Sequence, residues 1–148
     1  MISKGKFTTP PIPLKLGSKG LNFGRADILI HGVDQSGPSF EGRVFLNNPK
    51  AAFDTPTTPE HGYAGSFHVY GYGIWPDDIA KERKPAEAEA DTIRAPIEKD
   101  LIATDALRQA GSRGSEVTVT VVPVTGNPPH DAGDAMKLEG VSIEIHPT

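Results

Sequence analysis

The sequence predicts an all-β fold: an antiparallel β-sandwich of Greek-key or jelly-roll type with one short helix. The chain has 148 residues with 16 Gly and 14 Pro, which suits short strands joined by turns and is unfavourable in helices. Several segments alternate apolar and polar residues with a period of two, and turn residues separate them. No run of helical segments is placed to connect parallel strands.

Residues 1–24 are expected to form an extended arm, and residues 25–148 the sandwich domain. Three prolines among the first 13 residues disfavour a helix or a central strand. We therefore expect the arm to pack loosely, with Leu14 and Leu16 in an edge strand. A chain of this length can bury one core without disulfides or metal.

The first strand is predicted for residues 25–33, which place alternate apolar residues on one face. Residues 40–46 alternate in the same way, and Phe45 falls on the polar face. The Thr- and Pro-rich residues 49–62 then predict a long, stiff loop. The inward residues expected for the two strands are Ala26, Ile28, Ile30, Phe40, Val44 and Leu46.

A third strand is predicted for residues 63–72. Its spacing puts Tyr63, Phe67 and Val69 on one face. The other face is unusually aromatic; it carries Ser66, His68, Tyr70 and Tyr72.

The second half of the chain predicts a charged, solvated loop at residues 81–91 and a strand within residues 93–102. A short helix follows, with Thr104 as its N-cap and Gly111 as its stop. The last two strands are expected at residues 116–124 and 136–145, with Val117, Val119, Val121, Val141, Ile143 and Ile145 pointing inward.

Composition excludes several classes of function. The net charge of −4 supplies no basic field for nucleic acid, and the absence of cysteine removes thiolate nucleophiles and zinc ribbons. Neither a nucleophile elbow nor a phosphate-binding glycine loop occurs. No apolar run has the length of a membrane span or a signal peptide, which predicts a cytoplasmic protein, although export together with a partner stays open.

Among the five histidines, none forms the i, i+4 pair of a helical metal site. His68 is the most informative, because it shares a strand face with Tyr70 and Tyr72. This face, extended by Trp75, is suited to inserting rings into a partner's pocket. The same spacing also fits a purely structural aromatic ladder. His31, His130 and His146 are expected at the surface.

Four stretches of the chain, RADILIHGVDQSGPSFEGRVFLNN, TPEHGYAGSFHVYGYG, TDALRQAG and EVTVTVVPV, resemble the C-terminal domain of bacterial tyrosinases and polyphenol oxidase-like proteins. The resemblance covers most of the chain. It implies a β-sandwich that packs over a helical catalytic domain, where it shields a dinuclear copper site or assists copper loading.

The family's oxidase uses six histidines on a four-helix bundle, whereas this chain has five histidines and no bundle. The leading hypothesis is thus a non-catalytic, cofactor-free domain that packs on a type-3 copper oxidase through His68, Tyr70, Tyr72 and Trp75. A copper-binding accessory using His68 and His61 is one alternative. A module that associates with a second copy of itself is the other.

Overall fold

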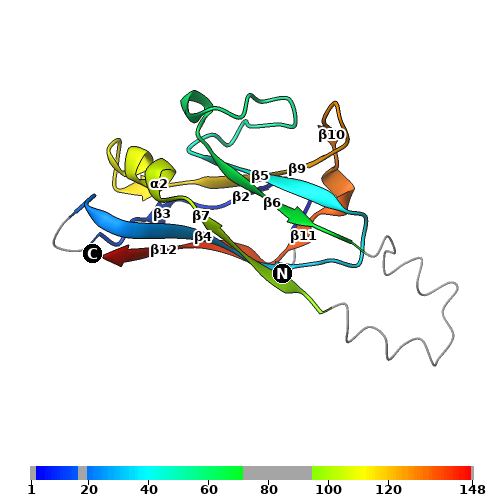
Figure 1. Cartoon of the computed structure of the whole chain (residues 1–148), viewed down its shortest axis with the longest axis horizontal. Helices are drawn as coiled ribbons and strands as arrows, with labels where there is room; N and C mark the ends of the chain where they lie inside the picture. Colours follow the sequence, from blue (N-terminus) through cyan, green and yellow to red (C-terminus); the bar gives the residue numbers. More distant parts are fainter. Residues whose placement is uncertain (1–2, 17–19, 72–94, 148) are drawn as a thin grey trace, which may run out of the picture.

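The computed structural model describes residues 3–16, 20–71 and 95–147, and it confirms an antiparallel all-β sandwich (Figure 1). The two largest sheets form its two layers, and helix α2 lies at one end of the described part of the chain. The described elements are β1 (Ser3–Lys4), β2 (Phe7–Thr8), β3 (Ile12–Pro13), β4 (Phe23–Val33), β5 (Phe40–Leu46), η1 (Pro59–His61), β6 (Tyr63–Val69), β7 (Ile97–Ile102), α2 (Thr104–Gly111), β8 (Glu116–Val117), β9 (Val119–Thr125), β10 (His130–Asp131), η3 (Gly133–Ala135), β11 (Lys137–Leu138) and β12 (Gly140–Pro147).

The first sheet has the strand order β10-β9-β5-β6, with β2 also paired to β9; we call it the β5 sheet. The second, the β4 sheet, has the order β12-β4-β7. Its register sets Ile28 opposite both Ile143 and Leu101. Residues that are directly opposite share a face, so these three side chains meet on the inner side of the sheet.

The main core lies between the two sheets, and the predicted alternation of the long strands is confirmed there. Ala26, Ile28 and Ile30 are fully buried, as are Val119 and Val121 of the facing sheet. The inner residues of β12 pack against this core from one side; they are Val141, Ile143 and Ile145.

A β-bulge in β6 corrects one prediction. Val44 pairs with Gly65, but the next residue, Phe45, pairs with Tyr63, so Ala64 is an extra residue in the ladder. One extra residue reverses the side-chain alternation beyond it. Tyr63 therefore lies beside Phe45 on the outer face, with ring centroids 5.6 Å apart, and does not share the inner face of Phe67.

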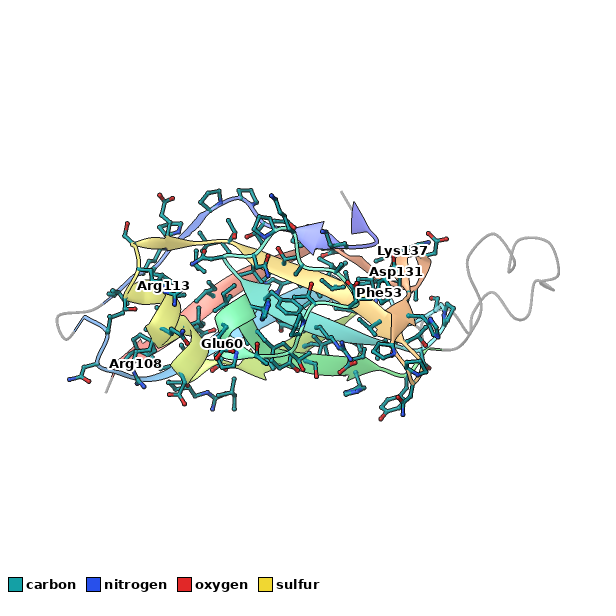
Figure 2. The ribbon with its side chains drawn as sticks, turned by 90° about the horizontal axis from the view of Figure 1, so that it is seen from above. Phe53, Glu60, Arg108, Arg113, Asp131 and Lys137 are labelled. Atoms are coloured by element: carbon teal, nitrogen blue, oxygen red, sulfur yellow. The ribbon has the colours of Figure 1, made fainter. Side chains whose placement is uncertain are left out.

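The loop 47–62 covers the outer face of the β5 sheet (Figures 1 and 2). The sequence predicts Phe45 on a polar face, yet it is fully buried, because the loop lies over it. This second, smaller core consists of Phe45, Ala51, Phe53, Tyr63, Val122 and Val124. β9 is therefore buried on both faces, and the sheet has no open outer surface at its centre.

The N-terminal segment is extended, as predicted, but it is not loosely packed. β1, β2 and β3 pair with β11, β9 and β8 respectively. Thr9 is buried and exchanges two hydrogen bonds with the backbone of Val119. The Lys6 ammonium donates to the carbonyl oxygens of Pro49 and Ala51. The segment thus holds both the β5 sheet and the covering loop in place. Of its two leucines, Leu14 packs on the core and Leu16 is exposed.

Helix α2 is present where it was predicted, but Thr104 and Gly111 do not have the predicted roles of N-cap and stop residue. Thr104 is the first helical residue, and its hydroxyl accepts a hydrogen bond from the Ala26 amide on β4 rather than capping the helix. Gly111 is the last residue of the helix, and a Cβ there would collide with Leu21. Close packing, not a left-handed turn, therefore explains this glycine.

Three predicted segments of the second half of the chain remain to be compared with the structure. Residues 81–91 lie outside the described residues. The strand expected within residues 93–102 is β7, and the strand expected at 136–145 is split at Glu139 into β11 and β12. Among the described residues, no helix is long and apolar enough to cross a membrane.

Candidate functional site

The exposed end of β6 carries two of the four residues predicted to face a partner. His68 is exposed on the outer face, and Tyr70 follows the strand with 82 % of its surface accessible. Tyr72 and Trp75 lie outside the described residues. β6 is an edge strand of the β5 sheet within the described part of the chain. Edge strands and exposed aromatic rings are both typical of contact surfaces.

A shallow depression of about 260 Å³ lies at this strand end, and His68 and Tyr70 are among the residues that line it. Residues of β5 and of the end of β9 line it as well. The residues that line it besides these two are Ser39, Phe40, Glu41, Val69, Val124, Thr125 and Gly126. We call this surface the β6 face.

A carboxylate stands beside the imidazole on the β6 face. Glu41 is directly opposite His68 in the ladder, where Cβ atoms are about 5 Å apart. Arg43 Nε donates to Glu41 Oε1 over 3.1 Å, and Arg43 also donates to the Phe53 carbonyl. The salt bridge holds Glu41 in place. The face therefore presents to a partner the phenol ring of Tyr70, the imidazole of His68 and the fixed carboxylate of Glu41.

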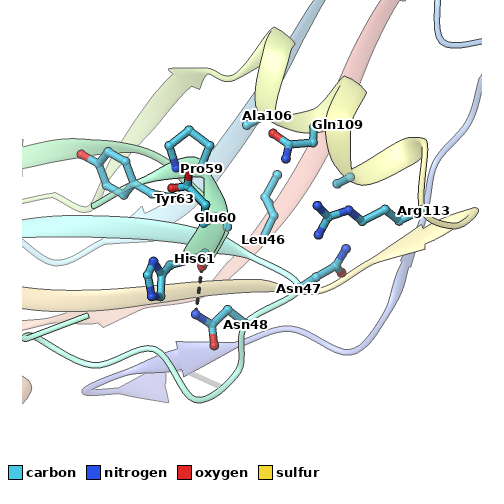
Figure 3. Close-up of a pocket in the computed structure, with 12 residues that line it drawn as sticks. Leu46, Asn47, Asn48, Pro59, Glu60, His61, Tyr63, Ala106, Gln109 and Arg113 are labelled. Carbon is cyan, nitrogen blue, oxygen red and sulfur yellow. Dashed lines mark hydrogen bonds between the residues drawn. The ribbon is translucent and has the colours of Figure 1, made fainter. Parts of the chain in front are cut away.

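His61 lies elsewhere, in the pocket between η1 and α2 (Figure 3). Its Nδ1 is 2.9 Å from the Thr58 hydroxyl, and its carbonyl oxygen accepts a hydrogen bond from the Asn48 amide. The turn also lowers the pKa of Glu60, first through a backbone hydrogen bond and then through the Thr58 hydroxyl. The imidazole is thus part of a hydrogen-bonded turn.

The pocket itself has a volume of about 300 Å³, at the lower limit of the size of small-molecule sites. Leu46 and Ala106 contribute apolar groups to its lining, and Asn47, Gln109 and Arg113 contribute polar ones (Figure 3). Sequence reasoning missed it, because its lining comes from residues 46–63 and 106–113, which are more than 40 positions apart, and no spacing rule joins them.

His61 and His68 do not form a common site. They lie at the two ends of β6, and seven residues of extended chain span about 20 Å. Within the described residues, which include all five histidines, no group of three histidine or carboxylate side chains is close enough to hold a metal ion. The donors present in this part of the chain therefore do not fit a copper centre, which needs several ligands at one point.

Comparison with known proteins identifies the fold. No family model and no curated protein matches the sequence. Among solved structures, latent aurone synthase, a polyphenol oxidase, matches over 97 % of this chain with a TM-score of 0.57 and 18 % identity. Latent apple tyrosinase matches over 99 % with a TM-score of 0.58 and 19 % identity.

The match covers only part of those enzymes. This chain corresponds to 25 % of the aurone synthase chain and to 27 % of the apple tyrosinase chain. The resemblance drawn from the sequence motifs is thus confirmed for the fold, which is that of a quarter-length portion of polyphenol oxidases. At identities below 20 %, fold is what such similarity establishes.

Proposed function

We propose that this chain carries no oxidase centre of its own but packs on the catalytic domain of a type-3 copper oxidase and shields it. The observation that carries the proposal is the fold shared with a quarter-length portion of latent polyphenol oxidases. In those proteins the remainder of the chain is about three times as long as the portion that matches, which leaves room for a separate catalytic domain.

The β6 face supports the proposal from this chain's own residues. An isolated tyrosine with 82 % of its surface accessible gains most by entering a partner's pocket, because aromatic rings contribute much of the energy at interfaces. Glu41 and Arg43 give the face a fixed pair of charges next to that ring. Such a pair fixes the orientation of a partner more than it adds affinity.

The test uses the purified chain and the catalytic domain of a type-3 copper oxidase encoded in the same genome. Sedimentation velocity of the mixture is expected to reveal a 1:1 complex, and oxidation of a catechol by the oxidase is expected to fall as the chain is added. Two independent species in the centrifuge with unchanged catechol oxidation would refute the proposal.

Self-association is the second candidate, and the exposed edges of the described sheets favour it. β6 ends one sheet, and β12 and β7 end the other. Unpaired strand edges can pair with a second copy of the same chain. Sedimentation of the chain alone separates the two candidates, since a symmetric dimer doubles the monomer mass of 15.8 kDa.

A further inference from the structure

Three side chains from three strands form a hydrogen-bonded row on the outer face of the β4 sheet. His31 on β4 lies in the middle. Its Nδ1 is 2.7 Å from Glu98 Oε1 of β7, and its Nε2 is 2.6 Å from Ser142 Oγ of β12. The proposed docking surface is on the other sheet, so this row plays no part in it.

The register of the sheet explains why the three meet. Ser142 is opposite Leu29, two residues from His31 on the same face, and diagonal neighbours are within reach of a long side chain. On the other side the pairing of β4 with β7 shifts between Ile30 and Val33. Glu98 lies at this irregularity, next to His31.

The two contacts also select one tautomer of the neutral imidazole. A carboxylate accepts only, so in the neutral ring the hydrogen belongs to Nδ1. Nε2 is then a bare acceptor and takes its hydrogen bond from the Ser142 hydroxyl. This is the sequence of groups in an activated serine: a hydroxyl, a base that can take its proton, and a carboxylate that orients the base.

The row is open to small molecules. The His31 side chain is 38 % exposed and that of Glu98 57 %, and Ser142 is half-buried. Water can therefore hydrogen-bond to each of these three side chains. Their contact with one another is thus not a requirement of burying polar groups. β12 is also an edge strand of the described sheet. Its outer edge is therefore not covered by another described strand.

We propose that Ser142 is a nucleophile for small activated acyl donors, with His31 as its base and Glu98 as a positioning residue. With an aryl ester, Ser142 Oγ forms a bond to the carbonyl carbon while its proton passes to His31 Nε2. The bond to the aryl oxygen breaks, and the phenol leaves with that proton. Water then hydrolyses the acyl-serine through the same base, which restores Ser142.

The first experiment treats the intact chain with a fluorophosphonate, which keeps the adduct because the phosphonyl-serine is not turned over. The Oγ–P bond forms, fluoride leaves, and the proton goes to His31. Intact-mass and peptide mass spectrometry are expected to find one adduct, on Ser142. Glu98→Gln should slow labelling, and His31→Gln, which removes the base, should slow it about 100-fold.

The matched control is Ser66, another half-buried strand serine, which is opposite Arg43 and not an imidazole. Ser66→Ala should leave labelling unchanged, whereas Ser142→Ala should abolish it. Circular dichroism and thermal unfolding of each variant show that the fold is retained. Labelling of Ser142 no faster than of Ser66, or labelling that His31→Gln leaves unchanged, would overturn the proposal.

A second readout uses p-nitrophenyl acetate. A burst of one equivalent of p-nitrophenol per chain, lost in Ser142→Ala and kept in Ser66→Ala, is expected from acylation followed by slower hydrolysis. Release that is linear from the start and equal in both variants would show that the protein surface, and not Ser142, reacts.

Discussion

Arg25 holds the carboxylate of Asp27 with two hydrogen bonds, from Nε to Oδ1 and from Nη2 to Oδ2, each 2.7 Å long. The Asp27 side chain is only 3 % exposed, whereas that of Arg25 is 49 % exposed. The guanidinium keeps the pKa of Asp27 below its usual value despite burial, which acts in the opposite direction. The buried carboxylate of Asp27 is thus stabilised by the guanidinium of Arg25, which remains partly exposed to solvent.

The first prediction concerns this pair. Asp27→Asn should lower the free energy of unfolding at pH 7 by about 1–3 kcal/mol, because Arg25 loses a charged acceptor. The folded pKa of Asp27 is lowered, so its contribution is present above the unfolded pKa of about 3.9 and is lost as pH falls through the folded pKa. We expect urea unfolding to give a smaller difference in the free energy of unfolding between wild type and Asp27→Asn at pH 2.5 than at pH 7. Asp105→Asn, at a side chain 99 % exposed, is the control and should unfold like the wild type. An equal gap at both pH values would contradict the assignment.

Asp100 should respond in the opposite sense. Its hydrogen bond with Asp27 raises the pKa of Asp100, with smaller contributions from burial and from the charge of Asp27. A raised folded pKa means that ionisation costs stability above it. Asp100→Asn keeps a hydrogen-bond donor without the charge, so its urea midpoint at pH 7 should exceed that of the wild type. The difference should disappear below the unfolded pKa of about 3.9. A lower midpoint at pH 7 would contradict an unfavourable ionisation of Asp100 beside Asp27.

The interior predicts a steric effect at Gly42. A Cβ on this residue would overlap the ring of Phe67, which packs edge-on against Phe40 with centroids 6.3 Å apart. Gly42→Ala should therefore lower the free energy of unfolding by about 1–3 kcal/mol through overpacking. Gly140→Ala is the matched control, because a Cβ at that position would have open space for 4 Å around it. Equal stability of the two variants would show that the ring moves aside freely.

The β6 face predicts a specific loss of binding. Tyr70→Ala should weaken the complex with the oxidase catalytic domain about tenfold, as expected for an interface aromatic, and His68→Ala should weaken it less. Neither should change the thermal unfolding of the chain alone, since both side chains are exposed. His146→Ala, at an exposed residue on β12 of the other sheet, should bind normally. Full affinity of Tyr70→Ala would place the interface elsewhere.

Copper provides the last prediction. Calorimetric titration of the chain with Cu(II) should show no saturable binding near one equivalent, because His61 and His68 lie at opposite ends of β6 and Cu(II) favours several ligands. His68→Ala should give the same titration curve. Stoichiometric binding that His68→Ala abolishes would instead support the copper-accessory hypothesis.

Much of the fold is predictable from the sequence, because period-two alternation is a local property. It places Ala26, Ile28 and Ile30 correctly in the core. It fails at Tyr63, where a bulge of one residue reverses the faces, and at Phe45, which a loop covers. Bulges and covering loops depend on the partner strand and on tertiary packing, and neither leaves a local signal.

The candidate sites are less predictable, for the same reason. His68 and Tyr70 can be placed on an exposed face, since they are two residues apart on one strand. The row of His31, Glu98 and Ser142 joins residues up to 111 positions apart, and its geometry arises only when β12, β4 and β7 align. The sequence places His31 at the surface but does not reveal its partners.

The pairing of β1, β2 and β3 with strands of residues 116–138 has a consequence for how the protein is made. A ribosome delivers the chain from its N-terminal side, so the segment that contains β2 leaves about 110 residues before its partner. At ribosomal speeds of about 5–20 residues per second, it waits roughly 5–20 s. The segment with β1, β2 and β3 is thus synthesised well before the strands that pair with it, and during that interval it is open to chaperones and proteases.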